Sequence, residues 1–274
     1  MEDALMEPYV PLTMLGKRIY YYKVTGSTNE DAKRLAEAGA EEGTIVIAEE
    51  QTAGKGRLGR RWLSPPGTSI LMSVLFRPPL APHRAQCLTM ITSLAVAEAV
   101  EAMTPLRVHI KWPNDILIRG KKAGGILTEL GIKGGSLDYA VVGLGLNVNV
   151  DFRDLKSPLI FLTSTATSLY NELGYRVPRT PLLLEILRRL EDKYIRLKEG
   201  EDFRPGWLKR LANLNQEVCV ITPHEVIEGT AIDVNQDGAL LVRTPTGEVR
   251  TVWAGDVTLK KDIRGGSYGF LEIC

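Results

Sequence analysis

The glycine-rich segment "AEEQTAGKGRLGRRWLSPPG", which begins at Ala48, places the strongest constraint on the fold. Gly54, Gly56 and Gly59 have the spacing G-x-G-x-x-G and follow an apolar run, residues 44–48, that predicts a strand. In a dinucleotide-binding turn, glycines at this spacing bring a pyrophosphate to the N-terminus of the helix that begins there. The segment therefore indicates either a dinucleotide site or a loop that holds another anion.

The residues that follow the glycines exclude the dinucleotide site. Pro65, Pro66 and Gly67 prevent a helix of useful length after the loop. No acidic residue stands about 20 positions further on to hold a ribose. The next predicted element is a second strand, "GTSILMSVLFRP", and not a crossover helix.

The charges around the loop still indicate an anion. No Asp or Glu occurs between Glu50 and Glu98. The basic residues in that interval are Lys55, Arg57, Arg60, Arg61, Arg77 and Arg84. We expect the three glycines to adopt positive φ, so that successive backbone N–H groups converge on an oxyanion. The alternative is a basic surface that binds nothing specific.

Composition is that of a soluble globular protein of 274 residues, with 44% hydrophobic residues, 24% charged residues and a net charge of +1. No apolar run reaches the ~20 residues that span a bilayer, and the acidic N-terminus does not resemble a signal peptide. The cysteines are Cys87, Cys219 and Cys274. Their wide spacing predicts free thiols in a reducing cytoplasm and no metal cage.

The stretch "GSTNEDAKRLAEAGA" predicts a helix that ends at Gly39. Its N-cap is Ser27 or Thr28, with Glu30 or Asp31 as the capping-box partner. Further helices are predicted over residues 87–103, over residues 180–198 with Thr180 as cap and Pro181 in the first turn, and over residues 206–213. Strands are predicted in "LRVHIKW", in "DILIRGKKAGGILTEL" with a turn at Gly120, and in "LDYAVVGLGLNVNV".

The pattern changes after Asn215. Short alternating strands are separated there by the turn pairs Asp237-Gly238 and Thr246-Gly247, which predicts a small antiparallel barrel. We therefore expect two domains, residues 1–214 and residues 215–274. The chain as a whole is of the α+β class.

Four motifs accompany the glycine loop. "GSTNEDAK" precedes it, and it is followed in order by "KWPND" at 111–115, "KKAGGILTEL" from Lys121 and "VVGLGLNVN" from Val141. Together they closely resemble the biotin protein ligases, over nearly the whole chain from about Tyr20. The resemblance implies a mixed sheet with flanking helices, of the class II aminoacyl-tRNA-synthetase-like type, followed by an SH3-like barrel. It implies the form without a DNA-binding domain, since only about 20 residues precede the first predicted helix.

The resemblance also implies a reaction in two steps. Biotin and Mg-ATP give biotinyl-5′-AMP and pyrophosphate, and the acyl group then passes to a lysine of a biotin carboxyl carrier protein. ATP, Mg²⁺ and biotin are the implied small molecules, with neither DNA nor membrane as a partner. Family members are often dimers, and the strand "LDYAVVGLGLNV" is a candidate for pairing across a two-fold axis.

Arg57 and Lys122 are the candidate catalytic residues, because cations must bring together a carboxylate and a phosphate that repel each other. By the resemblance, the biotin-binding residues are Ser27, Thr28, Asn29, Gln51, Lys55, Gly56, Arg57, Lys122 and Gly125. The ATP-binding residues are Arg57, Arg60, Trp62, Lys111, Asn114, Asp115, Lys122 and Asn147, with Asp115 also the candidate Mg²⁺ ligand. Simpler roles remain open: helix caps for Ser27 and Thr28, a core position for Trp62, a turn cap for Asp115 and a solvated turn lysine for Lys122.

Two positions of the loop depart from the family pattern. Many members have Arg where Lys55 stands and a third basic residue where Leu58 stands. Lysine replaces a point charge but not a bidentate fork, so we expect the Lys55 side chain to contribute less here.

Three other functions compete with this one. A lipoate ligase shares the chemistry, but its dithiolane substrate has no ureido group to use Ser27, Thr28 and Gln51. A biotin-sensing repressor needs a winged helix that the residues before the first helix do not accommodate. A non-catalytic module would bind nucleic acid through the loop, although this cationic window is isolated and the overall charge is nearly neutral.

Overall fold

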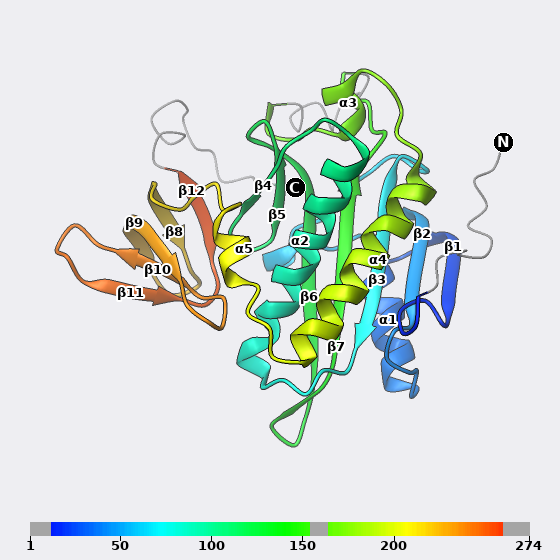
Figure 1. Ribbon diagram of the computed structural model, residues 1–274, viewed down its shortest axis with the longest axis horizontal. Helices are drawn as coiled ribbons and strands as arrows, with labels where there is room; N and C mark the ends of the chain where they lie inside the picture. The colour runs from blue at the N-terminus through cyan, green and yellow to red at the C-terminus, as the bar shows by residue number, and fades with distance from the viewer. Residues whose placement is uncertain (1–11, 154–163, 260–274) are drawn as a thin grey trace.

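A computed structural model describes residues 12–153 and 164–259, and its centre is a seven-stranded sheet (Figure 1). The strand order is β1-β2-β3-β7-β6-β5-β4, with β1 parallel to β2 and every other pair antiparallel. The strands are β1 (Ile19–Thr25), β2 (Ile45–Gln51), β3 (Ser69–Phe76), β4 (Val108–Lys111), β5 (Asp115–Ile118), β6 (Lys121–Lys133) and β7 (Ser136–Asn147).

Helices cover both faces of this sheet. The long helices α2 (Gln86–Met103) and α4 (Arg179–Lys198) pack together on one face, and α1 (Thr28–Glu37) lies on the other. The remaining helices are short: the 3-10 turns η1 (Arg57–Gly59) and η2 (Pro82–Ala85), α3 (Leu169–Leu173) and α5 (Arg204–Leu208). The result is a three-layer arrangement, with the glycine loop beside the first turn of α1.

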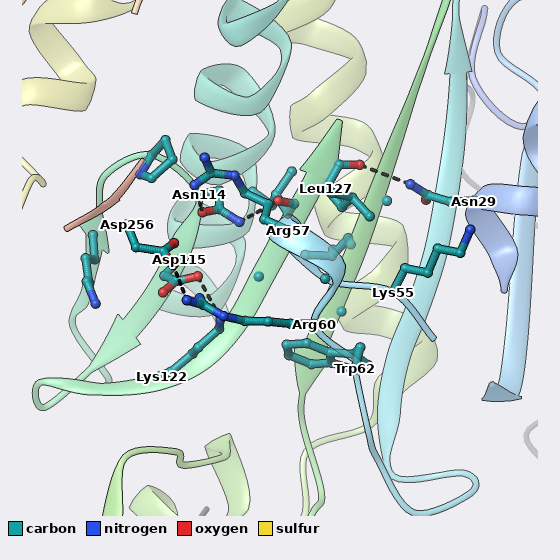
Figure 2. A pocket seen from close by; sticks show the side chains of 18 of the residues that line it. Asn29, Lys55, Arg57, Arg60, Trp62, Asn114, Asp115, Lys122, Leu127 and Asp256 are labelled. Carbon is teal, nitrogen blue, oxygen red and sulfur yellow. Dashed lines mark hydrogen bonds and ion pairs between the residues drawn. The ribbon is translucent and has the colours of Figure 1, made fainter. Parts of the chain in front are cut away.

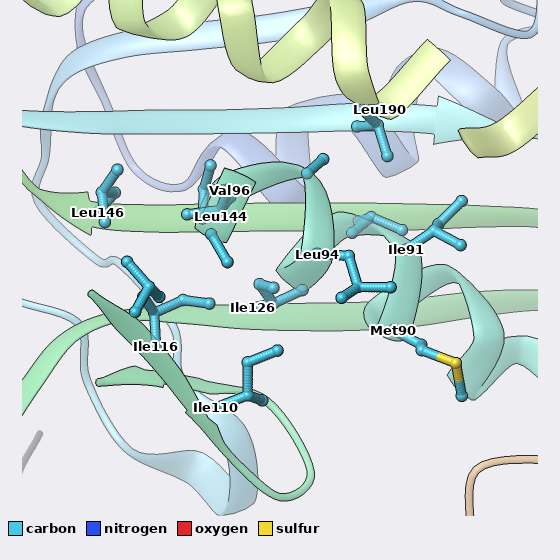
Figure 3. Close-up of a cluster of buried hydrophobic side chains, with 14 of the residues drawn as sticks. Met90, Ile91, Leu94, Val96, Ile110, Ile116, Ile126, Leu144, Leu146 and Leu190 are labelled. Atoms are coloured by element: carbon cyan, nitrogen blue, oxygen red, sulfur yellow. The ribbon is translucent and has the colours of Figure 1, made fainter. Parts of the chain in front are cut away.

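The main core lies between the sheet and α2. This helix is apolar on nearly all sides because it is enclosed by strands, by α4 and by α5. Figure 3 shows Ile91, Leu94 and Val96 of α2 in the same cluster as Ile126 of β6 and Leu144 of β7. Burial of such side chains stabilises the fold by about 1.5–3 kcal/mol each. The packed core therefore makes the sheet a rigid support for the residues on its other face.

The C-terminal region is a five-stranded antiparallel sheet in the order β11-β10-β9-β8-β12. Its strands are β8 (Glu217–Ile221), β9 (Val226–Val234), β10 (Leu240–Arg243), β11 (Val249–Val252) and β12 (Asp256–Leu259). Gly238 and Gly247 have positive φ at the predicted turns, which confirms those turns. The buried indole of Trp112 donates to the Gly238 carbonyl at 2.9 Å and joins this sheet to the main one.

The predicted mixed sheet with flanking helices is confirmed, and so is the hairpin turn at Gly120, which has positive φ. Three local predictions are wrong. Ser27 is the predicted N-cap of α1, but the predicted capping box is absent, since the Ser27 side chain makes no capping bond. Helix α4 begins at Arg179, after Pro178, and α5 spans 204–208 and not 206–213.

The strand proposed for two-fold pairing, β7, cannot serve that purpose. It lies inside the sheet, between β3 and β6, so both of its edges are already hydrogen-bonded. Strand β1 and helix α3 were not predicted. Cys87 is a buried free thiol, and Cys274 lies outside the described residues. Over 12–153 and 164–259, no helix is long and apolar enough to cross a membrane.

Candidate functional site

A pocket of about 850 Å³ lies between the glycine loop, the main sheet and β12. This volume counts all the space not taken by atoms, including space open to solvent. The predicted residues that line it are Ser27, Thr28, Asn29, Gln51, Lys55, Gly56, Arg57, Arg60, Trp62, Lys111, Asn114, Asp115, Lys122 and Gly125. Asn147 is not among the lining residues: it is buried, and its amide donates to the Thr167 carbonyl at 3.1 Å. Segments far apart in the sequence thus meet at one cavity, as Figure 2 shows.

One end of the pocket is polar but uncharged, and we call Ser27, Thr28, Asn29 and Gln51 the neutral end. The Gln51 carbonyl oxygen accepts from the Thr28 N–H at 2.7 Å and from the Thr28 hydroxyl at 3.1 Å. All of these residues except Gln51 are nearly fully buried. The Ser27 hydroxyl makes no hydrogen bond to the part of the chain that the structure describes, so it is available to a ligand.

The side-chain amide of Asn29 is hydrogen-bonded to other groups of the protein. Its Oδ1 accepts from the Ser73 hydroxyl at 2.6 Å, and its Nδ2 donates to Glu129 at 2.8 Å and to the Leu127 carbonyl at 3.2 Å. Gly143 leaves the room that this side chain needs, since a Cβ at 143 would stand 2.1 Å from the Asn29 Oδ1. Asn29 therefore holds the neutral end in place rather than presenting free polar atoms.

Ser73 belongs to this network and was not predicted. It lies on β3 with no exposed surface, and its Oγ is 2.8 Å from the Thr28 Oγ1. In the sequence, a serine inside "GTSILMSVLFRP" is indistinguishable from an ordinary strand residue. Only the antiparallel register of β3 places it beneath α1.

The glycine loop is a narrow hairpin and not the predicted nest of converging N–H groups. Its two sides pair through Gly56 N–H to Arg60 O at 2.8 Å and Trp62 N–H to Gly54 O at 3.0 Å. Of the three glycines only Gly59 has positive φ, whereas Gly56 is extended. Gly54 is required for space, because a Cβ there would stand 2.6 Å from the Trp62 carbonyl oxygen. The loop therefore offers side-chain cations rather than a backbone cradle.

The other end of the pocket carries Arg57, Arg60 and Lys122, which we call the cationic end. The Arg57 Nη1 donates to the Asn114 Oδ1 at 3.2 Å and to the Gly255 carbonyl at 3.3 Å. Burial lowers the pKa of the Arg57 guanidinium from its ordinary value, while the nearby carboxylates of Asp256 and Asp115 act in the opposite direction. Arginine stays protonated under such a shift, so Arg57 is a partly desolvated cation.

The C-terminal sheet contributes a carboxylate that sequence reasoning missed. Asp256, at the start of β12, lines the pocket and forms an ion pair with Arg60. Both side chains are about one-quarter exposed. No motif marked "AGDV" as a site, because the approach of β12 to the loop depends on how the two sheets pack.

Lys122 and Asp115 face each other across the β5–β6 hairpin. The Lys122 ammonium lies 2.8 Å from the Asp115 carboxylate and 6.0 Å from the centre of the Trp62 ring. The Trp62 indole packs on Gly125 and Gly145, where added Cβ atoms would approach it within 3.5 Å and 2.6 Å. Its Nε1–H is buried and has no hydrogen-bond partner within residues 12–153 and 164–259. Trp62 is therefore not an isolated core residue, and Lys122 is not a solvated turn lysine.

Lys55 lines the pocket but is turned away from the cationic end. Its ammonium lies 2.6 Å from the Glu30 carboxylate on α1. In Figure 2 it lies on the opposite side of the view from Lys122 and Asp115. Because its charge is already paired, Lys55 is a weaker candidate for direct ligand contact than Arg57.

The carboxylates of the pocket are its candidate metal ligands. Within the described residues there is no group of three or more His, Cys, Asp or Glu side chains that could hold an ion. A single carboxylate suffices for Mg²⁺ that is also held by phosphate oxygens. Asp115, which lines the pocket beside three cations, fits that limited role.

Two family models match the chain. Residues 21–147 match the biotin/lipoate A/B protein ligase family, and residues 214–260 match the biotin protein ligase C-terminal domain. The first match contains the neutral end and the cationic end, and the second contains Asp256.

Curated relatives and solved structures agree with these matches. The chain is 34% identical to the biotin–[acetyl-CoA-carboxylase] ligase of Mycobacterium tuberculosis, over 85% of each protein. It is 33% identical to the bifunctional ligase/repressor BirA of Bacillus spizizenii, over 90% of this chain and 75% of that one. The biotin protein ligase of Aquifex aeolicus, solved with biotin and ATP, superposes with a TM-score of 0.73 at 31% identity, covering 89% of this chain and 99% of that one.

Proposed function

The chain belongs to the biotin protein ligase family, and from this premise we propose that it activates biotin with ATP and transfers it to a lysine of a biotin carboxyl carrier protein. The observation that carries the proposal is the pocket itself, which joins a neutral polar end to a cationic end within one cavity. Such a cavity suits a substrate with an uncharged polar ring and a carboxylate that must meet a phosphate.

The cationic end addresses the main electrostatic obstacle. Two unit charges of like sign at 4 Å repel by about 4 kcal/mol at an effective dielectric constant of 20. Arg57 and Lys122 both line the cationic end, where Arg57 donates to Asn114 and Lys122 pairs with Asp115, so both cations are held in position before a ligand binds. The carboxylate oxygen attacks the α-phosphorus, the bond to the bridging oxygen breaks, and pyrophosphate leaves.

The neutral end suits the ureido ring of biotin. A ureido group presents two N–H donors and one carbonyl acceptor, which require matching partners when they are buried. The free Ser27 hydroxyl and the carboxamide of Gln51 are the candidate contacts. Thr28 holds Gln51, and Ser73 contacts both Thr28 and Asn29. The lipoate dithiolane offers no hydrogen-bonding groups that would use them.

ATP is the proposed second substrate, with Trp62, Lys111, Asn114 and Asn147 as its candidate partners. The unpartnered Trp62 Nε1–H supports a ligand contact on this side of the pocket. Mg²⁺ would enter with ATP, would neutralise phosphate charge, and would find the Asp115 carboxylate as its protein ligand. Asn147 would require rearrangement of its bond to Thr167 to reach the nucleotide.

The second step moves the acyl group to the carrier. The lysine amine of the carrier attacks the carbonyl carbon, AMP leaves, and the amine loses a proton to form the amide. The glycine loop and β12 flank the pocket, so they are the elements that would exclude water from the mixed anhydride.

Pyrophosphate release tests the first step without any carrier. The purified protein is incubated with Mg-ATP and either biotin, lipoate or no acid. We expect a burst of pyrophosphate with biotin alone, of about one equivalent per protein, because the intermediate stays bound until an acceptor arrives. Equal release without biotin, or release with lipoate alone, contradicts the proposal.

A further inference from the structure

An ion-pair chain crosses from the main sheet to one side of the glycine loop. The Lys33 ammonium lies 2.7 Å from Glu129 of β6 and 2.7 Å from Glu30 of α1. Glu30 in turn lies 2.6 Å from the ammonium of Lys55 in the loop. Charges therefore alternate in sign across two elements that are fixed in the core and one loop that is not.

The inner members of the chain are firmly held. Glu129 also accepts from Asn29 at 2.8 Å, which ties it to the neutral end. Burial acts to lower the pKa of Lys33, but its hydrogen bonds to Glu129 and Glu30 outweigh burial and raise it. Hydrogen bonds from Lys33 and Lys55 lower the pKa of the Glu30 carboxyl, so it stays ionised near neutral pH. Because Lys33 already fixes the Glu30 side chain, pairing with Lys55 costs less conformational entropy than an isolated pair would.

The loop has few other attachments on the α1 side. At its base, Thr52 and Ala53 donate backbone hydrogen bonds to Thr25 and Gly26 at 2.9 Å and 2.8 Å. Beyond Ala53, the backbone bonds of the hairpin are internal to the loop. On its other side, Arg57 and Arg60 contact Gly255 and Asp256. The Lys55–Glu30 pair is thus placed to hold one side of the hairpin against α1, while the arginines hold the loop against β12.

We propose that Glu30 is a positioning residue that tethers the glycine loop to α1 through Lys55, and so retains the acyl-adenylate in the pocket. The inference rests on the proposed function, since the retained species is the intermediate of that reaction. Glu30 does not line the pocket, so it touches no substrate. It acts by reducing the freedom of the loop that carries Arg57 and Arg60.

The first test measures how long the intermediate stays bound. Labelled biotinyl-AMP is formed on the protein, the mixture is diluted, and release is followed over time at low salt. Glu30→Gln is expected to release it about three times faster, which is the scale of an exposed ion pair. At about 1 M salt, where the screening length is about 3 Å, variant and unaltered protein should release at the same rate. Glu41→Gln, an exposed carboxylate that does not line the pocket, is the matched control and should release like the unaltered protein.

A double-mutant cycle separates a tether from a direct contact of Lys55 with the ligand. Lys55→Met should accelerate release by about the same factor as Glu30→Gln, and should add nothing when Glu30→Gln is already present. If Lys55→Met is equally costly in both backgrounds, Lys55 acts on the ligand itself and the tether is refuted.

Limited trypsin digestion tests the tether without any substrate. Cleavage after Arg57 or Arg61 follows the population of the open loop, so Glu30→Gln should raise its rate about threefold. Unchanged cleavage and unchanged release in Glu30→Gln overturn the tether while leaving the proposed function intact. If the unaltered protein forms no adenylate, the proposed function fails, and the retention claim fails with it. A digestion rate that does respond to Glu30→Gln would then still show the loop contact.

Discussion

The neutral end and the cationic end of the pocket are held by different kinds of contact. At the neutral end, Asn29 and Gln51 are fixed by short hydrogen bonds to main-sheet and α1 groups. At the cationic end, Arg60 and Lys122 are fixed by carboxylates from β12 and β5. A carboxylate can be exchanged for a phosphate oxygen, whereas a buried hydrogen-bond network resists exchange. The difference indicates that one end selects the acid and the other adapts as charge moves.

The largest effect is expected from removing a cation that meets the reacting groups. Arg57→Ala or Lys122→Ala should lower the rate of adenylate formation by about 10²–10³, as with other preorganised donors. Single-turnover pyrophosphate release measures it. Arg61→Ala is the control, because Arg61 is in the same loop but does not line the pocket. A loss below tenfold for both cations would remove the distinction between the two ends.

Crowding the neutral end should damage binding more than chemistry. Gly143→Ala places a Cβ 2.1 Å from the Asn29 Oδ1 in a buried network. Overpacking of this kind costs about 1–3 kcal/mol, so biotin should bind roughly 10- to 100-fold more weakly. Calorimetric titration with biotin reports it. Gly206→Ala, whose nearest contact is an ordinary 3.9 Å, should bind as the unaltered protein does.

Ser73→Ala is expected to have a smaller effect on biotin binding at the neutral end. It removes the hydroxyl that bonds Asn29 and approaches Thr28, at a cost of about 1 kcal/mol. We expect the KM for biotin to rise about fivefold while kcat and the KM for ATP stay unchanged. An equal rise in both KM values would mean that the two ends are not independent.

Asp256→Asn is expected to have the smallest effect. It replaces the ion pair with Arg60 by a neutral contact on a partly exposed pair, so the KM for ATP should change about threefold. The change should shrink with added salt, unlike that of Ser73→Ala. Steady-state kinetics at two ionic strengths distinguish the two variants. Salt-independent behaviour of Asp256→Asn would contradict an electrostatic role.

The sequence predicted the secondary structure of the main sheet well because periodicity and turn residues are local signals. The run from Cys87 to Met103 is mostly apolar, and α2 is indeed buried over most of this range. Errors arose where long-range contacts decide the outcome. No capping box forms at Ser27, and the neighbouring Thr28 N–H donates to Gln51, 23 residues further along the chain. The glycines of the loop were predicted to serve backbone conformation, but Gly54 serves the space beside Trp62.

The same distinction between local signals and long-range contacts applies to the candidate site. Its motif residues meet at one pocket because β5, β6 and β7 are neighbours in the sheet, and α1 and the glycine loop pack beside them. Ser73, Glu129 and Asp256 were not predicted, since each acts by contacting a residue more than 40 positions away. Lys55 was predicted from the loop alone, and its pairing with Glu30 depends on the packing of α1.

Intact-mass measurement of a carrier domain tests the central claim most directly. The domain is incubated with this protein and Mg-ATP, with biotin and lipoate supplied in separate reactions. We predict a gain of one biotinyl group with biotin, no gain with lipoate, and loss of the gain in Arg57→Ala and Lys122→Ala. A gain with lipoate alone, or no gain with either acid, would contradict the assignment of the neutral end to biotin.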